Sequence, residues 1–471
     1  MIALLLILLP LAAAVAAWPI RRENSARILL LLSSCVHTGL TVCCVTLPPA
    51  MSSFRWNGQE WIGLDDAGMI FLMVTSLLFL FVALHTVLES VAEGKNGSGL
   101  FREHFHLPCL LGFLATMTLV ITARNFGLLW VAVEATTLVS APLILLHRSG
   151  RSLEAMWKYL LICSVGIGFA LLGTMLTAVS ARAAGAAGLS MSDLAACSAA
   201  FPDDWFKAAF VLILAGYGTK TGLAPFHTWL PDAHSEAPAT VSALLSGSLL
   251  NCSFLAVIRF CQIAPEGVRP FCNELLTALG ILSLVVAAFF IIRQSDFKRM
   301  LAYSSVEHMG LAALLWGCGL ESISFLHLCG HSILKMTLFL LAGNFFLACG
   351  TRSVDRVGGL LGTMPRNAVL WIAAVLLICG TPPSPLFVTE YLLVQESGLW
   401  FGALVLFLLF AVFAGMTMAA LKMCMGPEGV ARPEEKRIPE AERLCFVPAL
   451  ALILALAAGC ALTVLFNQGA L

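Results

Sequence analysis

Long apolar runs separated by short polar connections occupy almost the whole chain. Windows of about 20 apolar residues are long enough to cross a bilayer. They occur at 2–20, 27–47, 67–90, 107–123, 125–146, 158–180, 206–229, 238–262, 272–293, 300–318, 322–349, 368–395, 400–424 and 444–466. The pattern therefore predicts an all-α polytopic membrane protein with about fourteen transmembrane helices. The longest polar segments, 48–64, 93–106, 181–205 and 426–443, leave no room for a soluble domain.

Composition and charge placement support a membrane protein and predict its orientation. Hydrophobic residues make up 59% and charged residues 11% of the chain, against about 25% charged in a typical soluble domain. Of the 27 lysines and arginines, nineteen fall in the connections on one side, six on the other, and two, Lys220 and Lys335, inside spans. The positive-inside rule then places both termini outside a bacterial cytoplasmic membrane, and this alternation agrees with an even number of spans.

The sequence contains no signature of a bound cofactor. Its sixteen cysteines lie mostly in spans and form no CxxC motif, and there is no GxGxxG or P-loop. Free cysteine in such segments behaves as a small hydrophobe. We therefore expect no metal, iron–sulfur or nucleotide site in this chain, so that any electron chemistry belongs to partner subunits. The small residues at 12–17 resemble a cleavage site, but Arg21 and Arg22 follow them and no basic segment precedes them, which favours a retained first helix.

Lys220 is a charged residue inside an otherwise apolar span. A lysine at the bilayer centre costs at least about 2.5 to 3.5 kcal/mol, so it is expected to face protein or water and to have a function there. Glycines at 216, 218 and 222 and Pro225 surround it. Such residues interrupt a transmembrane helix where its backbone lines a cavity.

A second interrupted span precedes Glu390. Pro382, Pro383 and Pro385 cannot lie within one unbroken helix. The two interrupted spans are the seventh and the twelfth, which predicts an inverted repeat of spans 4–8 and 9–13. The corresponding divisions are an N-terminal part (1–106), two repeats (107–262 and 272–424) and a C-terminal part (425–471). On this mapping Glu134 in span 5 matches Glu307 in span 10, since each follows a valine.

The remaining ionisable residues in spans are candidate proton carriers, because an intramembrane acid or base is a functional hypothesis by default. Glu134 lies in the middle of its span, whereas Glu307 and His308 lie nearer the end of theirs. The alternative for each is structural, a buried group satisfied by a neighbouring helix.

His327, His331 and Lys335 recur every four residues and so share one helix face over about 12 Å. Histidines at i and i+4 also suit zinc, but no further ligand accompanies them and Lys335 would repel a cation. A proton relay fits this arrangement better.

The polar segment 224–240 follows the first interruption and contains His227, Asp232, His234 and Glu236. These residue types could form a metal or active site. A helix cap beside a water-filled vestibule is the interpretation we favour.

Four motifs resemble one family of membrane proteins. They are Lys220 to Pro238, Asp296 to Gly310, His327 to Gly343 and Phe387 to Glu390. Together they resemble the proton-pumping antiporter-like subunits of respiratory complex I and their relatives in Mrp antiporters and group 4 membrane-bound hydrogenases. The form Ser304–Gly310 is most similar to the hydrogenase 4, or formate hydrogenlyase, branch and its F-type subunit.

The resemblance implies a proton-translocating subunit of a redox-driven complex that has no catalytic chemistry of its own. It implies that Glu134 pairs with Lys220, that protons enter near the Lys220 break and cross on the histidines and Lys335, and that Glu390 is the outlet. The proton-transfer residues expected on this basis are Glu134, Lys220, His227, His234, Glu307, His308, His327, His331, Lys335 and Glu390. Expected partners are further antiporter-like membrane subunits and soluble hydrogenase or iron–sulfur subunits.

One position departs from the family pattern, because Asn251 stands where many relatives have a lysine. An asparagine can bind water but cannot titrate. Two alternatives therefore stay open: a cation/proton antiporter subunit of an Mrp-type assembly without redox partners, and a scaffold that has lost conduction.

Overall fold

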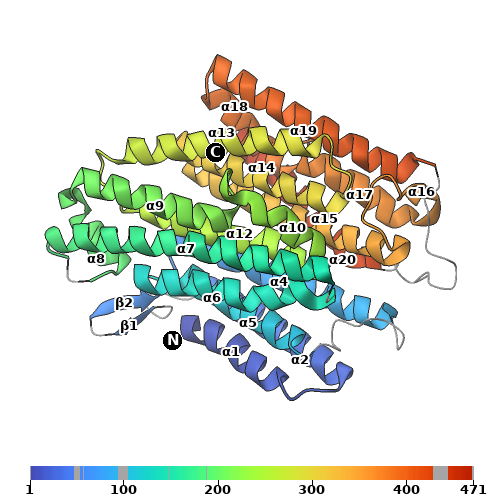
Figure 1. Ribbon diagram of the computed structural model, residues 1–471, viewed down its shortest axis with the longest axis horizontal. Coiled ribbons are helices and arrows are strands. Elements are labelled where there is room, and N and C mark those ends of the chain that lie inside the picture. Colours follow the sequence, from blue (N-terminus) through green and yellow to red (C-terminus); the bar gives the residue numbers. More distant parts are fainter. Residues whose placement is uncertain are drawn as a thin grey trace. The chain divides into compact units, whose positions relative to one another are not determined.

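The computed structural model describes residues 2–46, 53–56, 58–93, 104–147, 149–186, 188–427 and 444–468. Helices dominate these ranges, and their strands form a single antiparallel hairpin of β1 (Phe54–Trp56) and β2 (Gln59–Ile62) (Figure 1). The chain divides into two compact units. Unit 1 contains Met1–Ala83, Leu100–Trp229 and Ser248–Leu276, and unit 2 contains Leu84–Gly99, Leu230–Gly247 and Thr277–Leu471.

The protein is a multi-pass membrane protein, as its hydropathy predicts. Within the described ranges, ten helical segments are long and apolar enough to cross a bilayer, and three shorter apolar helices accompany them. The helix that carries Glu307 and His308 is not among these thirteen segments.

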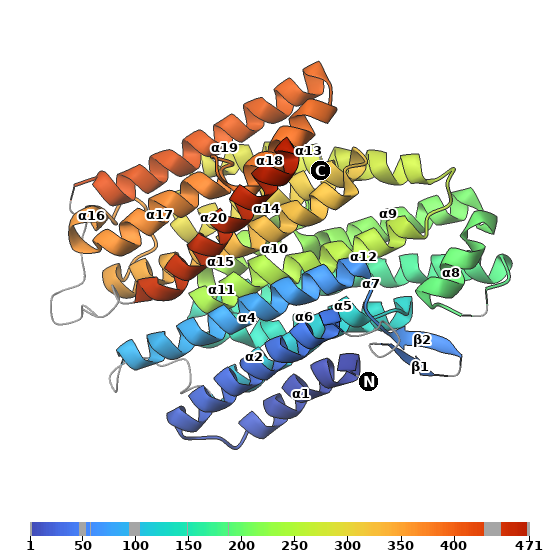
Figure 2. The ribbon, with the colours of Figure 1, turned by 180° about the vertical axis from the view of Figure 1, so that it is seen from behind.

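Unit 1 is built from helices that pack in sequence order. Its elements are α1 (Ile2–Ala17), α2 (Glu23–Thr46), the first part of α4 (Asp66–Glu93), α5 (His106–Thr122), α6 (Phe126–Ile144), η2 (Leu145–His147), α7 (Gly150–Ala183), α8 (Met191–Cys197), η3 (Ser198–Ala200), α9 (Asp203–Thr221), η4 (Phe226–Thr228) and α12 (Leu250–Gln262). Helix α1 lies beside α2 and α5 (Figure 2), α5 packs on α6, α6 on α7, α7 on α9, and α9 on α12. The hairpin and α8 fall in segments that the hydropathy pattern treats only as polar connections.

Helices α7 and α9 approach each other closely because small residues face one another. A Cβ built on Gly216 of α9 would lie 2.5 Å from the backbone nitrogen of Ala170 on α7. Small residues at such positions are the usual means by which membrane helices make close van der Waals contact. This contact fixes the helix that carries Lys220.

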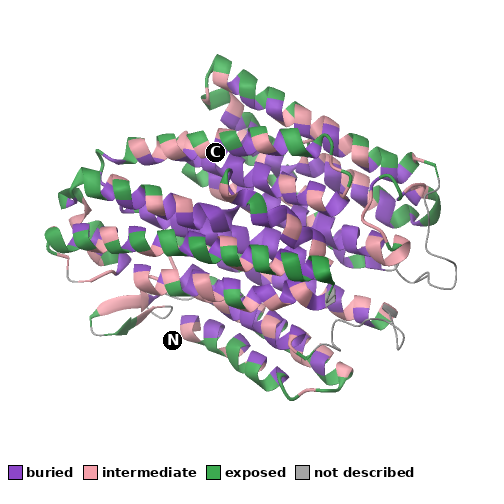
Figure 3. Cartoon of the chain, viewed as in Figure 1, coloured by how far each residue is buried: buried purple, intermediate pink, exposed green. Residues whose placement is uncertain are grey.

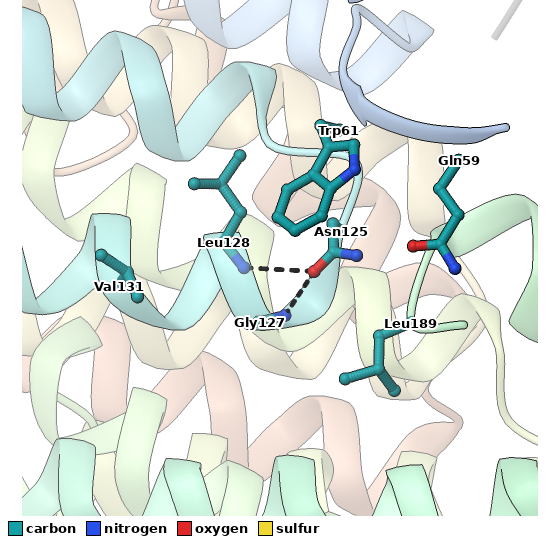
Figure 4. Close-up of a pocket in the computed structure, with 7 residues that line it drawn as sticks. All are labelled: Gln59, Trp61, Asn125, Gly127, Leu128, Val131 and Leu189. Carbon is teal, nitrogen blue, oxygen red and sulfur yellow. Dashed lines mark hydrogen bonds between the residues drawn. The ribbon is translucent and has the colours of Figure 1, made fainter. Parts of the chain in front are cut away.

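The β hairpin is joined to the start of α6. The backbone nitrogen of Arg124 donates to the carbonyl of Trp61 at 2.9 Å, and Asn125 caps α6 by accepting from the nitrogens of Gly127 and Leu128. A hollow of about 420 Å³ lies here between the hairpin and α6 (Figure 4). The residues that line it include none of the predicted proton carriers.

Arg259 joins three segments of unit 1. Its fully buried guanidinium donates to the carbonyls of Val120, Ile121 and Ala123 at the end of α5, and to Asp65 at 3.0 Å. Burial alone would raise the pKa of Asp65, but Arg259 and then Arg124 outweigh it and hold that pKa below its usual value.

Unit 2 is organised around one long helix, α15 (Glu321–Cys349). The other elements are α10 (Trp229–Glu236), of which Trp229 belongs to unit 1, α11 (Ala239–Leu244), the first part of the π-helical turn η5 (Leu245–Leu249), most of α13 (Arg269–Ile291), α14 (Phe297–Gly317), α16 (Leu360–Thr363), α17 (Pro365–Ile378), α18 (Pro385–Glu396), α19 (Leu399–Met425) and α20 (Phe446–Asn467). Helix α15 packs against α11, α14, α17, α18 and α20. As a result, every residue of α15 from Gly330 to Phe345 is buried (Figure 3).

The structure has an interruption at each of the two places where the sequence predicts one. Helix α9 ends at Thr221, and Gly222 follows with φ of 83°, a left-handed conformation that glycine adopts without strain. Helix α17 ends at Ile378, and α18 begins at Pro385 after a cap in which Ser384 accepts from the nitrogen of Leu386.

The segment after Lys220 is helical over most of its length. The span predicted over 238–262 is confirmed as one continuous apolar helix, Ala239–Gln262, which contains the π-helical turn η5 between α11 and α12. The segment 224–240, predicted as a cap and vestibule, is largely helical, because η4 and α10 occupy most of it. Its two acidic residues, Asp232 and Glu236, pair with arginines.

Candidate functional site

Lys220 lies in the last turn of α9, and its side chain is fully buried in unit 1. The ammonium donates to the hydroxyl of Thr137 on α6 at 2.8 Å and to the hydroxyl of Tyr159 on α7 at 2.5 Å. It also lies 4.5 Å from the centre of the Tyr159 ring and 6.0 Å from that of Trp229. Hydroxyl oxygens and aromatic faces both stabilise a cation without neutralising it.

The hydroxyls next to Lys220 form a chain with one direction. Ser140 donates to the carbonyl of Thr136 at 2.6 Å, so the hydroxyl of Tyr159, 2.7 Å away, must donate to Ser140. Tyr159 is therefore left as an acceptor toward Lys220. This arrangement fits an ammonium at position 220.

Glu134 lies on α6, three residues before Thr137, and does not touch Lys220. One carboxylate oxygen accepts from Ser164 at 3.0 Å, and the other has no hydrogen-bond partner among the described residues. Among the described residues no ion pair within 4.0 Å joins Glu134 to Lys220, although the Glu134 carboxylate interacts electrostatically with the lysine. The pair implied by the family resemblance is thus an indirect one in this structure.

Tyr159 and Thr137 are contacts that sequence reasoning missed. Tyr159 stands just after Trp157 and Lys158 at the edge of the predicted sixth span, where an aromatic residue is typical of a membrane interface. Thr137 offered a better signal, because it lies one helical turn from Glu134.

His227 and His234 lie on the short helices that follow the break. His227 belongs to η4 in unit 1 and is 8% exposed. His234 is on α10 in unit 2, fully buried, with its ring stacked on Phe339 at 4.8 Å.

The acidic residues of this segment make ion pairs. Asp232 pairs with Arg299, and Glu236 with Arg352 at 2.9 Å. Nowhere in the described ranges do three His, Cys, Asp or Glu side chains group closely enough to hold a metal ion.

The largest cluster of predicted residues is in unit 2. His327, His331 and Lys335 lie fully buried along α15. His308 of α14 faces both histidines, with ring centres 5.3 Å from His327 and 5.2 Å from His331. The four-residue spacing therefore predicts only the α15 side of this buried cluster. His308 on α14 forms the opposite side.

The hydrogen bonds in this cluster run in one direction from donor to acceptor. Thr389 of α18 donates to the carbonyl of Leu386 at 2.8 Å, so it accepts from Nδ1 of His327, also at 2.8 Å. Nε2 of His327 then accepts from Nδ1 of His308 at 3.2 Å. Nε2 of His308 is left to receive a proton, 4.0 Å from the carboxylate of Glu307.

The chain of hydrogen bonds leads to the residue before Glu390. Glu390 follows Thr389 on α18, is 9% exposed, and packs so closely on Gly380 that a Cβ there would collide with its carboxylate. At the other end of the cluster, Lys335 donates to the carbonyl of Leu301 at 2.8 Å and interacts electrostatically with Glu307. Buried acids, imidazoles and an ammonium thus lie in one region where protons can be held and passed on.

The predicted residues consequently form two groups. Glu134, Lys220 and His227 belong to unit 1, together with Asn251, which is buried on α12. His234, Glu307, His308, His327, His331, Lys335 and Glu390 belong to unit 2.

Comparisons with known proteins identify related sequences and folds. Residues 123–417 match the family described as "NADH:quinone oxidoreductase/Mrp antiporter, TM". The "Hydrogenase-4 component F homolog" of Methylacidiphilum infernorum (isolate V4) is 34% identical over 345 residues, which cover 71% of this chain and 72% of that protein.

Two solved structures share the fold. A chain of the membrane-bound sulfane sulfur reductase, an archaeal respiratory membrane complex, has a TM-score of 0.85 and 22% identity, covering 99% of this chain and 95% of that one. A chain of the Mrp complex from Dietzia sp. DQ12-45-1b also has a TM-score of 0.85, with 19% identity, covering 98% and 95%. At these identities the two structures establish the fold alone.

Proposed function

The chain belongs to the NADH:quinone oxidoreductase/Mrp antiporter transmembrane family, and we propose that it is the proton-translocating membrane subunit of a redox-driven complex. The observation that carries this proposal is the hydrogen-bonded series His308, His327 and Thr389 beside Glu390. A buried series of this kind costs free energy. Proton movement gives a reason for its presence that packing does not.

In unit 1, Lys220 is proposed to bind and release a proton under the control of Glu134. A carboxylate near an ammonium favours the protonated form, and its withdrawal favours release. Thr137 and Tyr159 accept hydrogen bonds from the lysine nitrogen, whether it is an ammonium or a neutral amine. A small change in the distance between α6 and α9 would then change whether Lys220 keeps its proton.

In unit 2, the proposed path starts at Nε2 of His308. A proton bound there displaces the Nδ1 proton of His308 toward His327, and the Nδ1 proton of His327 toward Thr389. Rotation of the Thr389 hydroxyl can then deliver a proton to the neighbouring Glu390. Glu307, His331 and Lys335 determine the electrostatic potential along this path. His234 of α10 packs on Phe339, which lies on the same face of α15 as Lys335.

The proposed topology has fourteen spans. The ten long apolar segments account for ten of these crossings. The other four are α1, α5, α14 and the interrupted pair of α17 and α18. The two interruptions and the positions of Glu134 and Glu307 support inverted repeats over 107–262 and 272–424. The bias of lysine and arginine supports termini on the outer side of the cytoplasmic membrane.

The proposed partners follow from the relatives. The similar proteins are a hydrogenase component homolog and chains of a sulfane sulfur reductase and of an Mrp complex. We propose further antiporter-like membrane subunits and soluble hydrogenase or iron–sulfur subunits for this chain. An Mrp-type antiporter without redox partners is less favoured, because a relative that is 34% identical over 71% of this chain and 72% of its own length is a hydrogenase component homolog.

Purification of the tagged chain in mild detergent, followed by mass spectrometry of the copurifying proteins, tests this assignment. Hydrogenase or iron–sulfur subunits are the expected result. Recovery of antiporter subunits alone would instead support the Mrp alternative.

A further inference from the structure

The end of α10 leaves backbone carbonyls that its own helix does not use. The helix contains eight residues, and Pro238 separates it from α11. The last carbonyls of any α-helix need partners from elsewhere. Here the hydrogen-bond donors come from two cationic side chains of unit 2, the buried Lys298 and the half-buried Arg352.

Lys298 and Arg352 both donate to this turn. The ammonium of Lys298, 5% exposed, lies 2.5 Å from the carbonyl of Ala237 and 3.5 Å from that of Ser235. The guanidinium of Arg352 donates to the same carbonyl of Ser235 and pairs with both carboxylate oxygens of Glu236, at 2.9 and 3.3 Å. Cations at a helix C-terminus also complement its dipole.

The clamp is connected to the start of α14. Asp296 accepts from the backbone nitrogens of Lys298 and Arg299, which caps α14, and its other oxygen accepts from the hydroxyl of Ser235 at 2.7 Å. We call Asp296, Lys298 and Arg352 the α10 clamp. Through these residues, the end of α10 and the beginning of α14 behave as one unit.

The residue held by this clamp is His234. Its ring is fully buried and stacks on Phe339 of α15, one helical turn beyond Lys335. Neither ring nitrogen has a hydrogen-bond partner among the described residues, while the backbone carbonyl accepts from Ser242 at 3.1 Å. The backbone therefore determines where this imidazole lies, and the clamp determines where the backbone lies.

We propose that Lys298 and Arg352 are positioning residues for His234, holding its imidazole against α15 beside Lys335. This inference rests on the proposed role of His234 in proton movement. In it, Lys298 is a fixed donor to carbonyls and does not relay protons itself. Lys298 and Arg352 affect proton transfer only by fixing the position of the His234 imidazole.

The test uses the intact complex in proteoliposomes and measures the rate of redox-driven proton movement. The variants are Lys298→Met, Lys298→Arg, His234→Phe and the double variant of Lys298→Met with His234→Phe. Lys422→Met is the matched control, because Lys422 is an exposed lysine paired with Asp355. Loss of a charge-assisted hydrogen bond corresponds to about a tenfold or greater effect, so Lys298→Met should slow proton movement at least about tenfold.

Lys298→Arg should keep most of the rate, because it retains the cationic donor. On the His234→Phe background, Lys298→Met should cause no further loss, since residues that act through one another are not additive. If the two losses multiply, Lys298 acts independently of His234 and the positioning inference is wrong, although the proposed function stands. If His234→Phe alone leaves the rate unchanged, His234 has no part in proton transfer. Its proposed role in proton movement and the positioning inference are then both wrong. Arg352→Gln provides the same cycle on a more exposed residue if Lys298→Met does not assemble.

Discussion

The ammonium of Lys220 lies 2.5 Å from the hydroxyl of Tyr159, whereas the carboxylate of Glu134 lies on the same helix as the second hydrogen-bond partner, Thr137, without touching the lysine. The lysine is therefore held by neutral oxygens and influenced by a charge at a distance. In this arrangement Thr137 and Tyr159 fix the position of Lys220, while Glu134 influences whether Lys220 keeps its proton.

Removal of the Tyr159 hydroxyl should slow proton movement. Tyr159→Phe keeps the ring that faces Lys220 but deletes one of its two acceptors. Loss of a hydrogen bond to a charged group is worth about 1.5 to 3 kcal/mol, so the rate in reconstituted complex should fall by about tenfold or more. Tyr391→Phe, a change at an exposed tyrosine of α18, is the control and should behave as wild type. Equal rates for both variants would contradict the role given to Tyr159.

Glu134→Gln and Lys220→Ala should each abolish coupled proton movement while the complex still assembles. Each removes one member of the proposed pair, Glu134 on α6 or the buried Lys220 on α9. Acidification of vesicles is the measurement, and Glu321→Gln, at an exposed acid in the first turn of α15, is the control. Either variant working at the wild-type rate would remove the pair from the mechanism.

Thr389 should be essential for its hydroxyl and not for its shape. Thr389→Val preserves the volume but breaks the link between His327 and the neighbourhood of Glu390. Thr389→Ser restores the hydroxyl. We expect at least about tenfold slower proton movement for valine, from the loss of a buried hydrogen bond, and near wild-type movement for serine. Similar behaviour of the two variants would show that protons bypass this residue.

Arg259 should matter for stability. Arg259→Met leaves three carbonyls of α5 without their donor and removes one of the two arginines that pair with Asp65, and breaking a buried ion pair costs about 3 to 5 kcal/mol. The thermal midpoint of the detergent-solubilised protein should fall clearly below that of Arg182→Met, a variant of an exposed arginine.

The interaction of Asp65 with Arg259 and Arg124 predicts that the stability of the protein depends on pH. Because the pKa of Asp65 is below its usual value in the folded protein, its contribution to stability is present above the unfolded value of about 3.9. That contribution is lost as the pH falls through the folded pKa. Asp65→Asn should therefore flatten the acid limb of the thermal midpoint measured against pH. An unchanged acid limb would mean that Asp65 does not govern it.

Cysteine labelling can establish the topology. On a background without native thiols, a cysteine at Ser353 should react only from the cytoplasmic side, and one at Trp56 only from outside. The basic residue Lys436, predicted to be cytoplasmic, lies outside the described residues, so Ser353 is the better probe. Labelling of Ser353 from outside would reverse the proposed orientation.

Sequence alone determined the class of the protein and most of its candidate residues. Hydropathy over windows of bilayer length is a local property, because every backbone group in lipid must be satisfied within its own helix. The interruptions near Lys220 and Glu390 were equally readable, since glycine and proline act on the backbone where they stand. The spacing of His327, His331 and Lys335 likewise defined one helix face before any fold was known.

Only the tertiary structure decided which groups those faces meet. Nothing in the sequence brings Tyr159 to Lys220, His308 between His327 and His331, or Lys298 to the end of α10. These contacts join residues up to 61 positions apart and depend on how helices pack. Helix packing follows from side-chain shape across many positions at once. A hydrogen bond, in turn, requires its two atoms to be within about 3 Å of each other. The sequence therefore identified the titratable groups, and the packing of the helices decided their partners.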